Sequence, residues 1–285
     1  MNATSSYLSA SPTLYLVPTP IGNFSDMTLR AIETLKTVDY VFAEDTRVTK
    51  VLLSHFQITT PLFSYHIFNE EERVNDVLDF LKQGHNIALV SDAGMPGISD
   101  PGFLVANKAI ALGFKVVALP GPVAFITALV ASGLPSNQMT FLGFLSHRQA
   151  TRQKEMRQFI NREETLIFYE SPHRIKAFLS DALLIFGNRE VVIARELTKK
   201  YEEYLRGNLE SAANIDVDLK GELVVMIKGT KEAAIAVSLN QKSLPEHYQY
   251  YLDQNLDAKE AMKKVAKDRN TTKSEIYRQL QKSSE

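Results

Sequence analysis

Between residues 14 and 132, five short apolar runs alternate with helix-like segments, and this alternation limits the possible folds more than any other feature of the chain. The segment 70–83, for example, places Val74, Val77, Leu78 and Leu81 on one helical face. Strands that are apolar along their whole length and separated by helices are typical of βαβ units. We therefore predict a mostly parallel sheet with both faces buried, whose strands lie at residues 14–17, 40–43, 62–66, 86–90 and 115–119.

A turn-rich break at residues 133–138 separates this region from a second set of predicted strands. These strands cover residues 140–145, 165–169, 190–195, 200–207 and 221–229, and helices are predicted over 151–161 and 172–186. The last strands have short connections, which predicts a mixed sheet. We therefore expect a loose tail at residues 1–13 and two α/β domains, at residues 14–134 and 135–235.

The chain from residue 242 onward has a helical pattern only, so we expect a small helical domain at residues 242–285. Its helices are predicted over 244–254, 258–269 and 273–281, with Asp257 and Thr272 as N-caps of the second and third. From residue 259 to residue 282 there are eight basic and three acidic side chains, a net charge of +5. Such a segment either contacts a polyanion or forms a solvated charged face.

The composition excludes several kinds of chemistry. The chain has no cysteine, which removes disulfides, thiolate metal sites and cysteine nucleophiles. Its six histidines lack ligand spacing, so we expect no metal site. A net charge of -1 argues against a protein whose whole surface binds nucleic acid. No basic residue precedes Arg30 and no apolar run is long and unbroken, so we expect a cytoplasmic protein that does not enter a membrane.

Three loops rich in glycine and proline directly follow predicted strands, at the edge where open α/β sheets bind ligands. They are PTPIGN at 18–23, SDAGMPGISDPG at 91–102 and PGPVA at 120–124. The second is much longer than the roughly two to six residues that a βα connection needs, which favours a functional role. Asp92 lies at the end of its strand, where it can accept hydrogen bonds from a polar ligand or cap a helix.

Polar clusters follow other predicted strands. They are AEDTR at 43–47, YESPHR at 169–174 and ARELTKKYEE at 194–203. Arg47 is suited to hold a phosphate with Glu44 and Asp45 orienting it, and the alternative is a capped, solvated helix start. Because each cluster ends a strand, we expect a shared cleft.

The motifs LYLVPTPIGN, AEDTR, SDAGMPGISDPG, PGPVA, YESPHR and ARELTK, in this order and spacing, resemble the tetrapyrrole methylase superfamily. Over about residues 14–229 the chain is similar to the ribosomal RNA small-subunit methyltransferase I family within it. The resemblance implies two α/β domains of the tetrapyrrole-methylase type that form a homodimer, with the cofactor in the interdomain cleft. It also implies that S-adenosylmethionine donates a methyl group to the ribose 2′-oxygen of a decoding-centre cytidine in 16S rRNA, so the partner is the small ribosomal subunit.

Carried over residue by residue, the resemblance places the cofactor on Pro20, Gly22, Asp92, Gly94, Met95, Val123, Ala124, Phe168, Tyr169, Ala194, Glu222 and Leu223. Transfer to a hydroxyl needs a group that takes its proton, and the candidates are Glu44, Asp45, Glu170 and Lys199. The residues expected to contact RNA are Arg47, Arg174 and Arg195, together with Lys263, Lys264 and Lys267 of the basic tail. We expect the RNA to be bound as an unpaired nucleotide, since a ribose inside a helix is poorly accessible.

Two other functions remain open. A tetrapyrrole C-methyltransferase acting on a corrinoid or siroheme precursor would use the same cofactor loops but needs no basic appendage. A protein that binds the cofactor without turnover would share the loops and transfer no methyl group. The basic tail and the AEDTR and YESPHR motifs favour the RNA enzyme.

Overall fold

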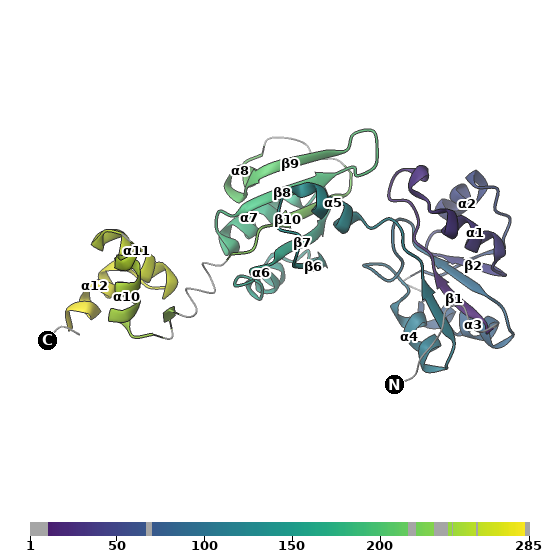
Figure 1. Ribbon diagram of the computed structural model, residues 1–285, viewed down its shortest axis with the longest axis horizontal. Coiled ribbons are helices and arrows are strands. Elements are labelled where there is room, and N and C mark those ends of the chain that lie inside the picture. Colours follow the sequence, from purple (N-terminus) through teal and green to yellow (C-terminus); the bar gives the residue numbers. More distant parts are fainter. Residues whose placement is uncertain are drawn as a thin grey trace. The chain divides into compact units, whose positions relative to one another are not determined.

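The structure is a computed structural model that describes residues 11–66, 70–215, 221–230, 239–240, 242–254 and 256–282. The chain folds into two compact units, and neither is continuous in sequence (Figure 1). The first unit comprises Met1–Ser132, Ile193–Leu205 and Asp218–Val224. The second comprises Gly133–Val192, Arg206–Val217 and Val225–Glu285. The first ten residues of the predicted tail lie outside the described residues, and the predicted domain limits stay predictions.

The sheet of the first unit is parallel throughout, as predicted. Its strands lie in the order β3-β2-β4-β1-β5, and every neighbouring pair runs in the same direction. The strands are β1 (Thr13–Leu16), β2 (Tyr40–Ala43), β3 (Leu62–Ser64), β4 (Ile87–Val90) and β5 (Lys115–Ala118). Because all five strands are parallel, their carboxyl ends meet at one edge of the sheet, and the loops that follow them start there.

Helices cover both faces of this sheet. Along β2, Val41 lies in a core shared with α1 and α2, whereas its neighbour Phe42 lies in a second core shared with α3 and α4. Successive strand residues point to opposite faces, so one apolar run supplies both cores. The helices of this unit are a short 3-10 helix (Phe24–Asp26), α1 (Leu29–Thr37), α2 (Thr46–His55), α3 (Glu70–Lys82), α4 (Phe103–Ala111) and α5 (Ala124–Ser132).

The second sheet has the strand order β6-β7-β10-β8-β9 and is mixed, as predicted. Its strands are β6 (Met139–Phe144), β7 (Thr165–Glu170), β8 (Glu190–Arg195), β9 (Glu203–Asn208) and β10 (Leu223–Ile227). Its helices are α6 (Gln149–Arg157), α7 (Ile175–Phe186) and α8 (Leu209–Ala213). The prediction of a strand at 200–207 was wrong at its start, because a turn precedes β9. The Glu202 N–H donates to the Lys199 carbonyl at 3.1 Å and closes this turn.

A buried ion pair joins α6 to α7. The Arg152 guanidinium donates through Nε and Nη2 to Asp181 Oδ2, at 2.9 and 2.6 Å. Gln149 and Gln153 donate to the other carboxylate oxygen at 3.0 and 2.7 Å. Burial acts to raise the pKa of Asp181, but the hydrogen bonds from Gln153, Gln149 and Arg152 outweigh it and lower the pKa. The carboxylate therefore stays charged and fully bonded.

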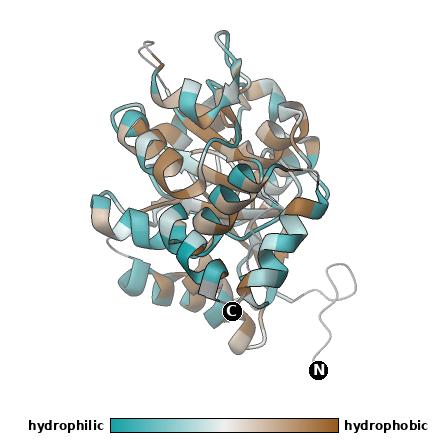
Figure 2. Ribbon diagram, turned by 90° about the vertical axis from the view of Figure 1, so that its left-hand side faces the viewer, coloured by the Kyte–Doolittle hydropathy of each residue, from teal (hydrophilic) through white to brown (hydrophobic). Residues whose placement is uncertain are grey.

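Three C-terminal helices pack around a small apolar core that includes Tyr251, Val265 and Ile276. In Figure 2 the helical ribbons change between hydrophilic and hydrophobic within a turn, the pattern of helices with one buried side. The predicted caps are confirmed, since Asp257 accepts from two backbone N–H groups of the second helix and Thr272 from one of the third. These helices are α10 (Leu244–Asp253), α11 (Ala258–Asp268) and α12 (Lys273–Lys282).

Candidate functional site

The loops after β1 and β4 are joined by a reciprocal backbone bridge. The Thr19 N–H donates to the Gly94 carbonyl at 2.9 Å, and the Gly94 N–H donates to the Thr19 carbonyl at 3.0 Å. The buried Thr19 hydroxyl donates to the Ser91 carbonyl at 3.0 Å, and the Ser91 hydroxyl donates to the Gly94 carbonyl at 3.2 Å. Two loops that are more than seventy residues apart in the sequence therefore form one rigid element.

The loop after β5 packs against the same element. A Cβ added at Gly121 would overlap the ring of Pro18, so only glycine lets the two loops approach this closely. Gly94 has a φ of +81° and faces Ile21 and the Pro122 carbonyl. We call residues 18–23, 91–102 and 120–124 the loop cluster. It contains seven of the residues predicted to bind the cofactor: Pro20, Gly22, Asp92, Gly94, Met95, Val123 and Ala124.

Asp92 connects the loop cluster to α2. Its Oδ1 accepts a hydrogen bond from the backbone N–H of Asp45 at 2.9 Å. Asp45 caps α2 and forms an ion pair of 2.6 Å with Arg47, whose side chain is 89% exposed. Hydrogen bonds from the Arg47 side chain and backbone lower the pKa of Asp45 to about 2. The AEDTR motif thus caps the start of α2 and also exposes the Arg47 side chain to solvent.

Asp100 lies within electrostatic reach of three other carboxylates of the first unit, Glu44, Asp92 and Glu222. Glu44 is also within electrostatic reach of Asp92. Burial, followed by the charges of Glu44, Asp92 and Glu222, raises the pKa of Asp100 to about 7. Burial and then the Asp92 charge also raise the pKa of Glu44. Asp100 was not among the predicted site residues, although the excess length of its loop was a signal for it. We call these four residues the carboxylate group.

The pH dependence of stability tests the environment of Asp100. Its pKa of about 7 lies above its usual 3.8, so the folded chain keeps this proton between those pH values while the unfolded chain loses it. The free energy of unfolding should therefore decrease as pH rises from about 4 to about 7. Asp100→Asn should remove this decrease and gain roughly 1–2 kcal/mol at pH 8, after allowance for screening by water. Urea unfolding at pH 5 and pH 8 measures it.

The control is Asp26→Asn, which changes an exposed carboxylate. The free energy of unfolding of this variant should differ between pH 5 and pH 8 by as much as that of the unsubstituted chain. An identical pH dependence in Asp100→Asn and the unsubstituted chain would contradict the buried, charge-crowded position of Asp100.

The loop after β8 is strained and approaches the loop cluster closely. Glu196 and Thr198 have φ values of 51° and 65°, in the left-handed region that non-glycine residues rarely adopt. Lys199 donates to Glu196 at 3.0 Å, and its stem covers Gly22, where an added Cβ would lie 2.6 Å from Lys199 Cγ. Gly221 in turn leaves space for the Glu196 carboxylate. Among the described residues, the buried Thr198 hydroxyl has no hydrogen-bond partner.

Four other predicted site residues lie in or next to β8 and β10, and their surroundings differ. Ala194 and Leu223 are fully buried strand residues, so only their backbone groups are suited to a ligand. Arg195 donates to Glu203 at 2.6 Å, which fixes its guanidinium at the start of the β8–β9 connection. Glu222 is exposed and belongs to the carboxylate group.

The YESPHR motif belongs to the second unit. The Glu170 side chain is fully buried, pairs with Arg174 at 3.3 Å and has its pKa raised by burial. Arg174 also donates to the Leu145 carbonyl at 2.8 Å. Phe168 is buried against Phe178 and Phe186, so its side chain is a core residue, whereas Tyr169 is partly exposed beside Phe141 and Phe144. The contacts of Glu170, Arg174 and Phe168 therefore stabilise the fold of the second unit.

The lysines of the basic tail are accessible. Lys263, Lys264 and Lys267 are all exposed on α11. No group of three or more His, Asp or Glu side chains in the described part of the chain has the arrangement of a metal site. Within the same residues, none of the helices combines the length and the apolar character needed to cross a membrane.

Comparison with known proteins defines the class. The family model of the Tetrapyrrole (Corrin/Porphyrin) Methylases matches residues 13–213. A diphthine synthase structure aligns with a TM-score of 0.62 at 14% identity, covering 76% of this chain and 90% of that one. The uroporphyrin-III C-methyltransferase of Thermus thermophilus complexed with S-adenosylhomocysteine aligns with a TM-score of 0.56 at 19% identity, covering 76% and 97%. These likenesses confirm the predicted fold, and with the family match they define a methyltransferase of the tetrapyrrole methylase class.

Sequence relatives narrow the class further. Ribosomal RNA small subunit methyltransferase I of Halalkalibacterium halodurans is 49% identical, over 93% of each chain. The protein of the same name from Bacillus subtilis is 46% identical, over 93% of this chain and 92% of its own. The chain belongs to the ribosomal RNA small subunit methyltransferase I family. This membership confirms the predicted resemblance and the predicted enzyme class, a methyltransferase that uses S-adenosylmethionine.

Proposed function

We propose that this chain methylates the ribose 2′-oxygen of a cytidine in the decoding centre of 16S rRNA, with S-adenosylmethionine as methyl donor. The observation that carries the proposal is the meeting of the loop cluster with the carboxylate group at the carboxyl edge of a parallel sheet. The relatives that share 46–49% identity with the chain support small-subunit rRNA as the substrate. We also propose that the enzyme acts in the cytoplasm, because its proposed substrate belongs to the ribosome.

The residues of the first unit fit this cofactor. S-adenosylmethionine carries a methyl group on a positively charged sulfur, ready for transfer to a nucleophilic oxygen. Its sulfonium and ammonium groups are cations, and the carboxylate group supplies a negative field that stabilises them. Asp92 is exposed and accepts polar contacts, while the close-packed glycines offer backbone groups. We assign cofactor binding to the predicted residues of this unit, which are Pro20, Gly22, Asp92, Gly94, Met95, Val123, Ala124, Ala194, Glu222 and Leu223. The predicted contacts of Phe168 and Tyr169, which belong to the second unit, stay predictions.

Among the four candidate bases, we propose that Glu44 takes the hydroxyl proton. It is half-buried and its pKa is raised, which makes its carboxylate a stronger base than an ordinary glutamate. Asp45, with a pKa of about 2, is a weak base that is already bonded to Arg47. Glu170 and Lys199 are held in ion pairs, so we assign them structural roles.

We assign the RNA contacts to basic side chains that are accessible to solvent. Arg47 is the most exposed of the three predicted arginines and adjoins Glu44, so we propose that it holds a phosphate next to the reacting ribose. Arg195 and Arg174 are held by Glu203 and Glu170, and they contribute positive potential. Lys263, Lys264 and Lys267 add affinity through counterion release.

The salt dependence of RNA binding tests the lysines. Replacing Lys263, Lys264 and Lys267 together by alanine should weaken RNA binding and lower the slope of log affinity against log salt by about 2, at about 0.7 per phosphate contact. Cofactor affinity should stay the same, because the carboxylate group belongs to the first unit. The control replaces Lys36, Lys82 and Lys154, three exposed lysines on other helices. An unchanged salt slope in the α11 variant would remove these lysines from the RNA interface.

Methyl transfer from tritiated S-adenosylmethionine tests the function itself. We expect label in the 16S rRNA of unmodified 30S subunits, on the ribose of one decoding-centre cytidine. Label in a tetrapyrrole alone would contradict the proposal. Cofactor binding with no transfer to any substrate would indicate a binding protein.

We also propose a homodimer, as the resemblance implies. Phe103 on α4 and Val130 on α5 are each 72% exposed, and side chains of this kind are costly to leave in water and suit a subunit interface. Sedimentation velocity should give the mass of two chains. Phe103→Asp should shift the protein toward monomer, whereas Leu184→Asp on α7, a similarly exposed position, should leave the mass unchanged. A monomer without any substitution would contradict the proposal.

A further inference from the structure

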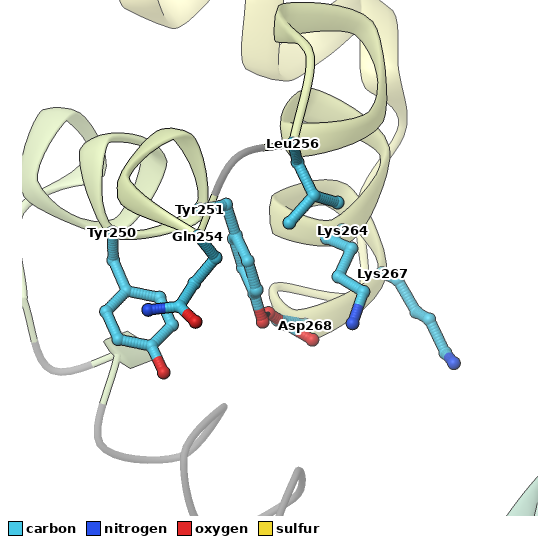
Figure 3. Close-up of a pocket in the computed structure, with 7 residues that line it drawn as sticks. All are labelled: Tyr250, Tyr251, Gln254, Leu256, Lys264, Lys267 and Asp268. Atoms are coloured by element: carbon cyan, nitrogen blue, oxygen red, sulfur yellow. Dashed lines mark hydrogen bonds between the residues drawn. The ribbon is translucent and has the colours of Figure 1, made fainter.

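A groove between α10 and α11 has the chemistry of a nucleotide site and lies outside the methyl-transfer machinery (Figure 3). Tyr250 of α10 and Gln254, which caps this helix at its C-terminal end, form one wall. Lys264 and Lys267 of α11 extend on the other side. Its volume is about 350 Å³. This is the lower part of the size range of small-ligand sites, and it suits one nucleotide rather than a folded domain.

The floor of the groove is held by a buried hydrogen-bond network. Tyr251 donates to Asp268 Oδ2 at 2.5 Å, and His247 Nε2 lies 3.1 Å from the same oxygen. Arg269 donates through Nε to His247 Nδ1 at 3.1 Å, and through Nη2 to the Lys242 carbonyl at 2.7 Å. Burial lowers the pKa of His247, so this histidine is neutral and bridges a donor and an acceptor. The network ties α10 to α11 and keeps the two walls at a fixed separation.

The charges at the groove suit a phosphate. Lys264 and Lys267 are exposed at its edge, and the Lys264 ammonium lies 5.5 Å from the centre of the Tyr251 ring. Asp268 is the acidic residue of the lining, and its Oδ2 is engaged by Tyr251 and His247. That leaves Asp268 Oδ1 to accept a hydrogen bond from a sugar hydroxyl or a base amino group. A ligand with a negative group and hydrogen-bond donors fits this arrangement.

Tyr250 supplies a surface for an aromatic ring. It is half-buried, and its ring is held in edge-to-face contact with Tyr251, at 5.3 Å between centroids and 76° between planes. Proteins that bind single-stranded nucleic acid combine such a supported aromatic ring with basic side chains for the backbone. Paired bases are not available for stacking of this kind, so the groove selects an unpaired nucleotide.

We propose that this groove binds one unpaired nucleotide of the RNA substrate, with its base on Tyr250 and its phosphate on Lys264 and Lys267. The inference rests on the proposed function, because it assumes an RNA substrate. It differs from a helix–turn–helix contact, in which α12 would enter a duplex groove. Lys264 and Lys267 line the groove and are exposed, whereas Arg278 of α12 is not among the lining residues.

Fluorescence anisotropy of the full chain with a labelled ten-nucleotide single-stranded RNA tests the site. The duplex probe is a hairpin whose stem pairs that ten-nucleotide sequence with its complement. Tyr250→Ala should weaken single-strand binding about 5- to 100-fold, while Tyr250→Phe should stay within about threefold, since the phenyl ring still stacks. Tyr277→Ala on α12, which removes an exposed tyrosine outside the groove, should have no effect. The thermal midpoint of each variant shows that the helices remain folded.

Two results would overturn the inference. One is an affinity for single-stranded RNA that Tyr250→Ala leaves unchanged or that Tyr277→Ala weakens equally. The other is a hairpin that binds as tightly as the single strand, which would favour a duplex contact. The 30S methylation assay separates this from the proposed function. If the chain methylates 30S subunits but Tyr250→Ala leaves its RNA affinity unchanged, the groove proposal is wrong and the proposed function stands. If RNA binding depends on Tyr250 but no methylation occurs, the proposed function is wrong and the groove proposal stands.

Discussion

Glu44→Gln should lower the rate of methyl transfer to 30S subunits by about 100-fold or more, the usual contribution of a positioned proton acceptor. The glutamine keeps the size and polarity of the side chain but cannot take up a proton. Because burial and the Asp92 charge raise the pKa of Glu44, the rate in the unsubstituted enzyme should increase with pH through that raised pKa and then level off. The variant should lose this rising limb. Single-turnover rates across pH measure both effects.

The matched control is Glu33→Gln, an exposed glutamate on α1 that should leave both the rate and its pH dependence as they are. Cofactor affinity, measured by calorimetry, should change little in Glu44→Gln, since three carboxylates of the group remain. A variant with an unchanged rate and an intact rising limb would show that another group takes the proton.

Arg152→Ala should reduce the free energy of unfolding by about 3–5 kcal/mol, the second large effect that we expect. The substitution leaves the Asp181 carboxylate buried without its cation, although Gln149 and Gln153 still donate to it. Denaturant unfolding measures the loss. The exposed Arg157 on the same helix is the control, and Arg157→Ala should change stability by less than about 0.5 kcal/mol.

A double substitution separates the charge from the packing. Arg152→Met with Asp181→Leu removes both charges and keeps apolar volume, so it should recover most of the stability that Arg152→Ala loses. Equal losses in the single and double variants would show that the two side chains act mainly through their hydrogen bonds to α6 and α7 rather than as a charge pair.

The fold of the first unit could be predicted closely from the sequence. Its strands are apolar on both faces, and turn residues bound them, so the ends of β2 were predicted to the residue. The start of β9 was missed, because the residue types signal neither the turn from Lys199 to Glu202 nor the left-handed Glu196 and Thr198 before it. Conformations imposed by contacts distant in sequence leave no local pattern.

Some parts of the candidate site could likewise be predicted from the sequence, and others could not. Loops rich in glycine and proline are visible in a sequence, because these residues mark unusual backbone directly. The proximity of Asp100 to Glu222 cannot be seen in the sequence, since it depends on how the chain returns to the first unit just before β10. Phe168 shows the opposite limit, as a strand-end aromatic whose side chain lies in the core. Motif position alone does not tell which way a side chain points.

The reciprocal hydrogen bonds between Thr19 and Gly94 have a consequence for ligand entry. Two otherwise independent loops lose their separate freedom when the chain folds, so a ligand that binds there does not have to order them. Their amide protons should resist exchange with solvent to the same degree before and after a ligand arrives. Affinity at this edge is then set by the contacts the ligand makes, and not by the work of assembling the surface that receives it.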